Sequence, residues 1–243
     1  MYGTNPTVGR VTKTGDEYQV ANIFLTVQGE GPFAGHPAVF VRLTGCPLHC
    51  AFCDTVWDDT NDPRMSAQDI LQKAVSLWPD TNNVRPRFVV ITGGEPTRWP
   101  LLPLLQRFKN FNGFDIQIET AGVYDVSEYA HLADFVVSPK TDIVHPSVND
   151  AAQYWKYPLD AMNIDENDGL PNFIQHTVAP TRGFKLFRPR RPPIDLPRKQ
   201  IFVTPIDTGN EDSNASNRAV VSRVAIAYGY TAGLQLHKFM GVE

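Results

Sequence analysis

All three cysteines of the chain, Cys46, Cys50 and Cys53, lie within one short stretch and follow the spacing Cys-x3-Cys-x2-Cys. Thiolates are soft ligands that favour iron–sulfur clusters or zinc. Both kinds of centre usually take four protein ligands, and this chain has no fourth cysteine. A cubane cluster held by three thiolates keeps one iron open, and an open coordination position is where chemistry takes place. The spacing therefore predicts a reactive iron–sulfur cluster.

The same cysteines could instead bind zinc, pack in the core or form a disulfide. A zinc site with His49 as the fourth ligand ranks second after the cluster, because His49 directly precedes Cys50 and chelation by both would be strained. Plain core packing ranks third, since cysteines that merely pack rarely gather so closely. A disulfide is disfavoured by the odd number of cysteines and by the lack of a secretory segment.

Length and composition bound the class of protein. A chain of 243 residues suits one large domain, or one domain with an elaborate insertion. Hydrophobic residues make up 42% and charged residues 20%, as in ordinary globular proteins. A net charge of −4 gives no overall basic field for nucleic acid. We expect no membrane span, because no apolar run is long enough, and we expect a cytoplasmic protein because clustered thiols suit a reducing compartment.

Hydrophobic periodicity predicts an alternation of strands and helices after an N-terminal hairpin at 8–21, which has a turn at 14–16. A short apolar run at 22–31 ends in a Gly-Glu-Gly turn. The predicted strands are 38–43, 88–92, 115–120, 134–140, 200–204 and 231–238. The predicted helices are 66–78, 101–111 (stopped near Gly113) and 214–228. Such alternation predicts an α/β fold, an open partial (β/α) barrel of about six mainly parallel strands.

The stretch 141–199 interrupts this alternation. It is rich in proline, aspartate and asparagine, and it predicts an irregular insertion with short strands near 173–178. We expect a single domain over 1–243, with its core at 22–140 and 200–239. A basic run at 185–191 is either a phosphate grip or, as we prefer in an acidic protein, a loop that offsets nearby acids.

Several polar residues follow predicted strands, at the end where α/β barrels form their sites. Arg42 interrupts a buried strand just before the cysteines, so its charge needs an anionic partner, either a ligand or a carboxylate such as Glu30. Gly93-Gly94-Glu95-Pro96 offers backbone N–H groups and a carboxylate that can hold an ammonium group. Each such turn alone is an unremarkable connector, but these lie close to the cysteine loop in the predicted fold.

The cysteine spacing, the aromatic Phe52 before the third cysteine and the Gly-Gly-Glu-Pro turn resemble the radical S-adenosylmethionine (SAM) enzymes. A sharper resemblance is to the 7-carboxy-7-deazaguanine synthases of the queuosine and deazapurine pathway. It is carried by the blocks 27–32, 42–46, 53–55, 91–96, 118–120, 138–140 and 235–238. The similarity covers 22–140 well and 200–239 more loosely.

This resemblance implies a reaction and its cofactors. SAM on a 4Fe–4S cluster yields a 5′-deoxyadenosyl radical, which takes a hydrogen atom from C6 of 6-carboxy-5,6,7,8-tetrahydropterin. The ring contracts, ammonia leaves and 7-carboxy-7-deazaguanine forms, while SAM is regenerated. Mg²⁺ assists. The implied partners are an electron donor such as flavodoxin and a second copy of the chain in a homodimer, without nucleic acid or membrane.

The resemblance also implies roles for individual residues. The cluster ligands are Cys46, Cys50 and Cys53, and the SAM contacts are Phe52, Asp54, Gly94, Glu95, Glu119, Ser138 and Lys140. The substrate contacts are Val27, Gln28, Gly29, Arg42, Thr92 and His237, with Glu30 as a further candidate. Mg²⁺ is expected on Thr55, or else on Asp58 or Asp59. The chain departs from the family pattern at Thr204-Pro205, where glutamine is expected before the proline.

Two other functions are compatible with parts of the sequence. Another small radical SAM enzyme, such as a glycyl-radical activase, would share the barrel and the cysteine loop but would need a groove for a protein substrate. A non-enzymatic zinc or iron–sulfur module would leave the Gly-Gly-Glu-Pro and Ser-Pro-Lys strand ends without a purpose. Metal analysis separates the module from the enzymes if the metal proves to be zinc.

Overall fold

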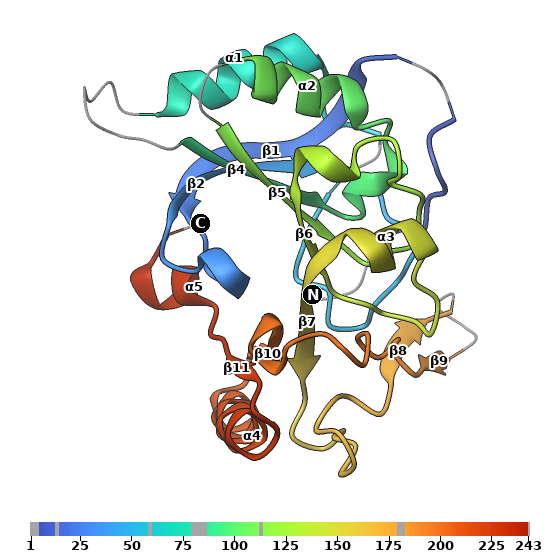
Figure 1. Ribbon diagram of the computed structural model, residues 1–243, viewed down its shortest axis with the longest axis vertical. Coiled ribbons are helices and arrows are strands. Elements are labelled where there is room, and N and C mark those ends of the chain that lie inside the picture. The colour runs from blue at the N-terminus through green and yellow to red at the C-terminus, as the bar shows by residue number, and fades with distance from the viewer. Residues whose placement is uncertain are drawn as a thin grey trace.

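The computed structural model describes residues 5–12, 15–57, 60–78, 87–111, 114–178 and 183–242. These residues form a curved nine-stranded sheet, with helices α1, α2, α3 and α4 outside the curve (Figure 1). The sheet does not close on itself, so the predicted open α/β barrel is confirmed. The strand order is β11-β10-β7-β6-β5-β4-β2-β1-β3, and β8 and β9 form a separate two-stranded sheet.

The bounds of the elements follow the sequence closely in the first half of the chain. The strands are β1 Glu17–Val27, β2 Pro37–Leu43, β3 Arg64–Ser66, β4 Arg87–Gly93, β5 Phe114–Thr120, β6 Asp134–Val137, β7 Ala152–Leu159, β8 Ile174–Thr177, β9 Phe184–Phe187, β10 Ile201–Pro205 and β11 Thr231–Ala232. The helices are α1 Ala67–Leu77, α2 Leu102–Asn110, α3 Pro146–Ala151, α4 Glu211–Tyr228 and α5 Leu236–Met240. The predicted end of α2 at Gly113 lies outside the described residues.

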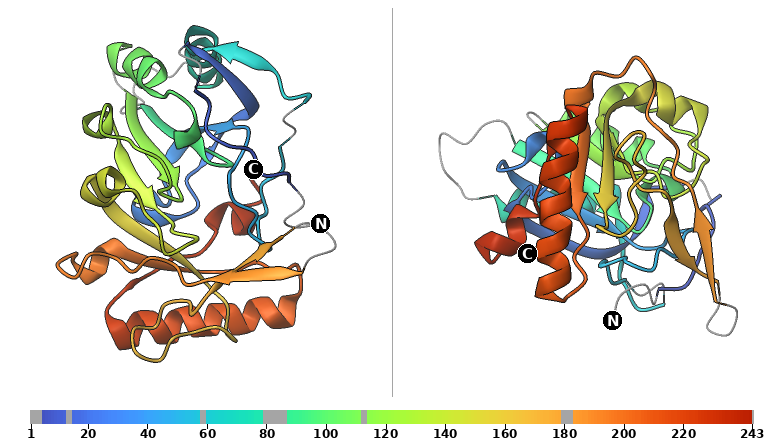
Figure 2. Two further views of the ribbon diagram at one scale, coloured as in Figure 1. Left: turned by 90° about the vertical axis from the view of Figure 1, so that its right-hand side faces the viewer. Right: turned by 90° about the horizontal axis from the view of Figure 1, so that it is seen from below.

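Within the nine-stranded sheet, seven neighbouring strands, from β2 to β11, are parallel, whereas β1 pairs antiparallel with both β2 and β3. Helices α1, α2 and α4 lie along the outer face, as the side view in Figure 2 shows. Because successive residues of a strand point to opposite faces, Val39, Val41 and Leu43 of β2 join the core under the helices. Phe40 and Arg42 of the same strand face inward. The inner face is therefore the side left for a site.

The helix boundaries have local causes. Ser66 caps α1, because its hydroxyl accepts from the backbone N–H of Asp69 while the Asp69 carboxylate accepts from the N–H of Ser66. Asn210 caps α4 in a similar way, and Gly229 ends it with a φ of +74°. These caps place the two helices on the outer face where the sequence predicted them.

The predicted hairpin at 8–21 is not formed. Residues 8–12 lie in no strand, and β1 pairs instead with β2 and β3. The backbone N–H of Val8 donates to the carbonyl of Cys46 at 2.8 Å, and that of Val11 to Arg98 at 2.9 Å. The backbone of this stretch therefore bonds to the cysteine loop and to the turn at Arg98 and not to a neighbouring strand.

The stretch 141–199, expected as an insertion, contributes a central strand. β7 lies between β6 and β10 in the main sheet, and Trp155, Tyr157 and Leu159 are fully buried on its outer side. The predicted strand near 173–178 is present as β8. The prediction of an irregular stretch missed β7 because this strand lies among many prolines, aspartates and asparagines, which are typical of loops.

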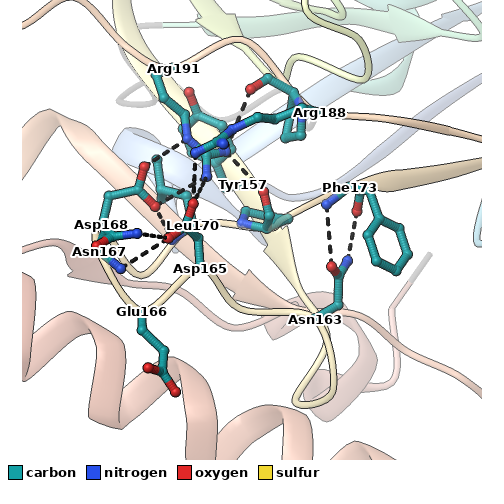
Figure 3. Close-up of polar contacts among 12 residues, drawn as sticks. Tyr157, Asn163, Asp165, Glu166, Asn167, Asp168, Leu170, Phe173, Arg188 and Arg191 are labelled. Atoms are coloured by element: carbon teal, nitrogen blue, oxygen red, sulfur yellow. Dashed lines mark hydrogen bonds and ion pairs between the residues drawn. The ribbon is translucent and has the colours of Figure 1, made fainter.

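A cluster of ion pairs holds the loop after β7 (Figure 3). Arg188 Nη2 lies 2.6 Å from the Asp165 carboxylate, and Arg191 Nε lies 2.7 Å from the Asp168 carboxylate. Asp165 is buried, so its charge requires these partners. Arg188 and Arg191 of the basic run at 185–191 thus offset nearby acids, as expected for an acidic protein.

The C-terminal segment differs from its prediction. Only Thr231 and Ala232 extend the sheet, and residues 236–240 form α5 instead of continuing a strand. The backbone N–H of Leu236 donates to the carbonyl of Gly29 at 3.1 Å. This hydrogen bond directs the chain away from β10. Within the described part of the chain, we find no helix with the length and apolar character that crossing a membrane requires.

Candidate functional site

A cavity of about 290 Å³ opens on the inner face of the sheet, at the carboxyl ends of its strands. Residues from widely separated stretches of the chain line it, from β1 to α5. The predicted residues among them are Val27, Gln28, Arg42, Cys46, Cys50, Phe52, Cys53, Asp54, Thr55, Thr92, Gly94, Glu119, Ser138, Lys140 and His237. Gly29 and Glu95 are the predicted site residues that do not line it.

The three cysteines are free thiols on the loop that follows β2. Burial raises the pKa of Cys46 and Cys53, and raises that of Cys50 to about 12. Negative neighbours raise these pKa values further, namely Glu95 and the other two thiols for Cys46, Cys53 for Cys50 and Asp54 for Cys53. Three thiolates therefore become favourable here only beside a strongly positive centre. Within the described residues, no three His, Cys, Asp or Glu side chains are placed to hold a single metal ion. A cluster suits this donor set better, because each thiolate binds a different iron.

Glycines let the β4 end pack against the cysteine loop. A Cβ at Gly94 would lie 2.4 Å from the carbonyl oxygen of Gly45, and one at Gly93 would lie 1.9 Å from that of Leu43. Gly93 also has a φ of +139°, which other residues rarely adopt. The N–H of Gly94 donates to the carbonyl of Leu43 and that of Glu95 donates to Gly45. The Gly-Gly sequence is thus required by close backbone approach.

Glu95 lies beneath the cavity and is fully buried. Its Oε1 accepts hydrogen bonds from the N–H and hydroxyl of Thr97, at 3.0 and 2.6 Å, and from the hydroxyl of Thr120 at 2.7 Å. Its Oε2 accepts from the N–H of Ala121 at 2.7 Å. The carboxylate therefore ties the end of β4 to the end of β5 in place of pointing at a ligand.

A network of charged and amide groups forms the wall across from the cysteines. Glu119 Oε1 accepts from Gln28 Nε2 at 3.2 Å and from Gln117 Nε2 at 3.1 Å. Lys156 Nζ lies 2.5 Å from Glu30 Oε2 and 3.6 Å from Glu119 Oε1. Burial alone would lower the pKa of Lys156, but the two carboxylates outweigh it and raise that pKa. Burial opposes the charge of Glu30 too, and Lys156 nonetheless holds the pKa of Glu30 below its usual value.

Lysine and histidine complete the rim. Lys140 Nζ donates to the carbonyl and hydroxyl oxygens of Ser138, and burial lowers its pKa. His237 on α5 lies over Gly29 so closely that a Cβ there would come within 2.0 Å of its Nδ1. Burial lowers the pKa of His237. Because Gly29 has no side chain, the His237 ring can lie at the edge of the cavity.

Arg42 points into the cavity from β2, and its Cζ lies 5.3 Å from the centre of the Phe24 ring. Glu30, the carboxylate that could have been its partner, is paired with Lys156. Among the described residues, no carboxylate lies within ion-pair distance of Arg42. Its guanidinium is therefore available to an anionic ligand.

The loop past the third cysteine carries the residues expected near Mg²⁺. The carbonyl of Thr55 accepts from Asn5 Nδ2 at 2.7 Å, and Asp54 lies 3.7 Å from Lys238 Nζ. Asp58 and Asp59 lie outside the described residues. The side chain of Thr55 faces the cavity, where a hard cation would find its hydroxyl.

Sequence reasoning missed several residues of the site. Lys156 and Pro158 line the cavity from β7, and Asp207 and Gln235 line it from the C-terminal third. Lys156 could have been found, since Trp155, Tyr157 and Leu159 alternate with it and so place it on the inner face. Thr204, which stands where glutamine was expected, is 4% exposed and still lines the cavity.

The comparisons with known proteins agree with this geometry. The profile of the radical SAM superfamily matches residues 40–165, more than half of the chain. The cysteine loop, the Gly-Gly-Glu-Pro turn and the open parallel barrel are thus those of a radical SAM domain. This superfamily implies a 4Fe–4S cluster and SAM, and the three cysteines around the cavity suit that cluster.

Individual relatives narrow the class. A 7-carboxy-7-deazaguanine synthase of Rhodospirillum rubrum is 34% identical over the full length of both chains. One of Rickettsia prowazekii is 32% identical, over all of this chain and 96% of that protein. The crystal structure of QueE from Escherichia coli superposes with a TM-score of 0.60 at 28% identity, covering 90% of this chain and 94% of that one. This chain belongs to the 7-carboxy-7-deazaguanine synthase family of radical SAM enzymes.

Proposed function

We propose that the protein converts 6-carboxy-5,6,7,8-tetrahydropterin to 7-carboxy-7-deazaguanine, with loss of ammonia. One observation carries this proposal: a single cavity is lined both by the three cysteines and by Arg42, Gln28 and Glu119. When bound, the cluster and SAM supply a radical that abstracts hydrogen. The residues on the far wall offer what a planar heterocycle with a carboxylate requires.

Substrate recognition falls to the inner face of β1 and β2. Gln28 is fixed because its Nε2 donates to Glu119 and its Oε1 accepts from the N–H of Glu30. An amide has two donors and two lone pairs, so Gln28 keeps one of each for the pterin edge. Arg42 presents a planar fork to the carboxylate. Val27, Thr92 and His237 close the remaining sides, and Gly29 seats His237.

SAM would lie between the cysteine loop and the ends of β4, β5 and β6. We propose contacts from Phe52, Asp54, Gly94, Glu119, Ser138 and Lys140, which all line the cavity. Glu95 would serve the same site from beneath, since it holds Thr120 and Ala121 in place. Thr55 is proposed to bind Mg²⁺ through its hydroxyl.

Three further features are proposed on the family resemblance. They are a flavodoxin-like electron donor, a homodimer and a cytoplasmic location. We also propose that the whole chain is one domain, because β7 ties residues 152–159 into the sheet between β6 and β10. Analytical ultracentrifugation of the reconstituted protein tests the dimer.

The decisive experiment is anaerobic turnover. Reconstituted protein is incubated with SAM, 6-carboxy-5,6,7,8-tetrahydropterin (called the carboxypterin below), Mg²⁺ and a chemical reductant. The product is identified by its mass. We expect 7-carboxy-7-deazaguanine and ammonia in equal amounts without net consumption of SAM. A fully loaded cluster that cleaves SAM yet leaves the carboxypterin intact would contradict the proposed substrate.

A further inference from the structure

The β8 strand is paired with the cysteine loop. The N–H of Thr177 donates to the carbonyl of His49, and the N–H of Ala51 donates to the carbonyl of Gln175, both at 2.9 Å. Cys50 and His176 are the antiparallel bridge partners between these two hydrogen bonds. Strand β8, more than a hundred residues along the chain, is thus hydrogen-bonded to the two residues that flank Cys50.

The His176 ring is held on three sides. Its Nε2 lies 3.0 Å from the carbonyl oxygen of Lys140 and 3.8 Å from Cys50 Sγ. Phe187 of β9 meets the ring edge-on at 4.9 Å between centroids, and the side chain is 5% exposed. Because a carbonyl oxygen only accepts hydrogen bonds, the Nε2 atom carries the proton. This N–H group donates to the Lys140 carbonyl, and because its nitrogen also lies 3.8 Å from Cys50 Sγ, its positive hydrogen is close to the sulfur as well.

We propose that His176 is a positioning residue that raises the reduction potential of the cluster held by Cys50. The inference rests on the proposed function, which places a 4Fe–4S cluster on the three cysteines. Reduction adds one negative charge to the cluster and its sulfurs, and an N–H dipole beside a ligating sulfur stabilises that charge. Hydrogen bonds to cluster sulfurs are among the groups that set such potentials.

This contact differs from those of the other cysteines. Cys46 Sγ accepts from the backbone N–H of Leu48 at 3.4 Å, a contact that no substitution removes simply. The contact to Cys50 comes from a side chain. His176 also links the cluster loop to Lys140, so the ring joins the two sides of the site. A side-chain donor can be deleted while the backbone hydrogen bonds between β8 and the loop, from Thr177 to His49 and from Ala51 to Gln175, stay in place.

The test compares donor-free and donor-bearing replacements. His176→Phe and His176→Met introduce an apolar side chain of similar length that has no N–H group, whereas His176→Gln provides an amide N–H. The reduction potential is measured by titration followed by electron paramagnetic resonance, and Fe–S(Cys) stretching is followed by resonance Raman. Gln175→Ala on the same strand is the matched control, since its backbone carbonyl still accepts from Ala51.

We expect the two donor-free variants to bind a full cluster at a more negative potential. At the wild-type midpoint, the ratio of reduced to oxidised cluster should fall roughly two- to tenfold, as the loss of one net hydrogen bond predicts. His176→Gln should recover part of the difference, and Gln175→Ala should match the wild type. The Raman bands of the variants should shift in the same order.

Several outcomes overturn the proposal. Potentials equal to the wild type in both donor-free variants show that the N–H group has no effect on the cluster. A cluster lost in both, and kept with glutamine, assigns His176 to assembly in place of tuning. Wild-type protein that binds zinc, or no iron and sulfide, contradicts the proposed function itself and is recognised before any variant is compared.

Discussion

The two walls of the cavity are held by different forces. The cluster wall, formed by the cysteine loop and Gly93–Gly94, is fixed by backbone hydrogen bonds such as that from Gly94 to Leu43. The charged wall, formed by Gln28, Glu30, Glu119 and Lys156, is fixed by side-chain contacts between the strands β5 and β7 and the turn after β1. A backbone framework tolerates loss of a side chain, whereas a buried ion network does not.

This difference separates the expected effects of substitution. Replacement of a cysteine on the cluster wall leaves the backbone hydrogen bonds from Gly94 and Glu95 to the loop in place, so the metal is lost and the fold remains. Removal of one charge from the other wall leaves a buried partner unpaired, which costs stability as well as function. The predictions below test this contrast.

The largest effect is expected on the cluster wall. Replacement of any one of Cys46, Cys50 and Cys53 by alanine should abolish both the cluster and turnover, because no fourth cysteine can substitute. Iron and sulfide analysis after anaerobic reconstitution measures the first and product mass the second. The melting temperature of the apoprotein should stay close to that of the wild type. Stoichiometric iron and sulfide in a variant with all three cysteines replaced by alanine would refute the assignment.

On the charged wall, Lys156→Met should lower stability at neutral pH. Loss of one partner from a buried ion network costs about 3–5 kcal/mol, since Glu30 and Glu119 would face each other without a cation. Anaerobic denaturant unfolding of the apoprotein measures this. The conservative variant Lys156→Arg should retain most of the stability.

The pH dependence of this loss follows from the depressed pKa of Glu30. A carboxyl whose pKa is lowered by folding adds stability above its unfolded value of 4.5, and loses it as the pH falls through the folded value. The raised pKa of Lys156 adds stability below 10.5 and loses it only at higher pH. The gap between wild type and Lys156→Met should therefore be constant from about pH 6 to 9 and shrink in acid. A gap that widens in acid would show that Glu30 is not the partner.

The same contrast explains what the sequence revealed. The cluster wall consists of short contiguous motifs, and the family resemblance that such motifs carry located Cys46, Gly94 and Lys140 in one site. The charged wall is assembled from residues more than a hundred positions apart, such as Glu30 and Lys156. No local pattern reports such a pairing, and the missed strand β7 hid Lys156.

The predicted secondary structure was wrong where the backbone forms hydrogen bonds to distant loops and not to the expected neighbouring strand. Residues 8–12 were expected as one strand of a hairpin, but their backbone bonds to the loops at Cys46 and Arg98. The C-terminal segment was expected to extend the sheet to residue 238, but Leu236 bonds to Gly29 and a helical turn follows. Glu95 was recognised as a functional glutamate, yet only the structure shows that its carboxylate faces the protein.

An intermediate effect is expected for Arg42→Lys. Lysine keeps the charge but loses the planar fork, so binding of the carboxypterin should weaken by about 2–5 kcal/mol. SAM binding, the cluster spectrum and the melting temperature should barely change, because the described carboxylates leave Arg42 without an ion pair. Substrate affinity and melting temperature are measured on the same preparation.

Arg87→Lys is the matched control for this change. Arg87 also lies over aromatic rings, those of Phe111 and Phe114, but it does not line the cavity. Its substitution should leave substrate affinity as in the wild type. If Arg42→Lys lowers the melting temperature and leaves affinity normal, Arg42 is structural and the carboxylate is bound elsewhere.

The smallest effect is expected for Thr55→Ala, at the edge of the cluster wall. The backbone of Thr55 holds the loop by accepting from Asn5, and alanine keeps that carbonyl. Only the hydroxyl is lost, so cluster content should not change while turnover should need more Mg²⁺. A Mg²⁺ titration of turnover measures this, and Thr55→Ser, which keeps a hydroxyl, should follow the wild-type curve. A cation held by one protein oxygen, substrate and water loses only part of its affinity with that oxygen, so saturating Mg²⁺ should restore most of the rate. An unchanged curve for Thr55→Ala would move the ion to Asp58, Asp59 or another ligand.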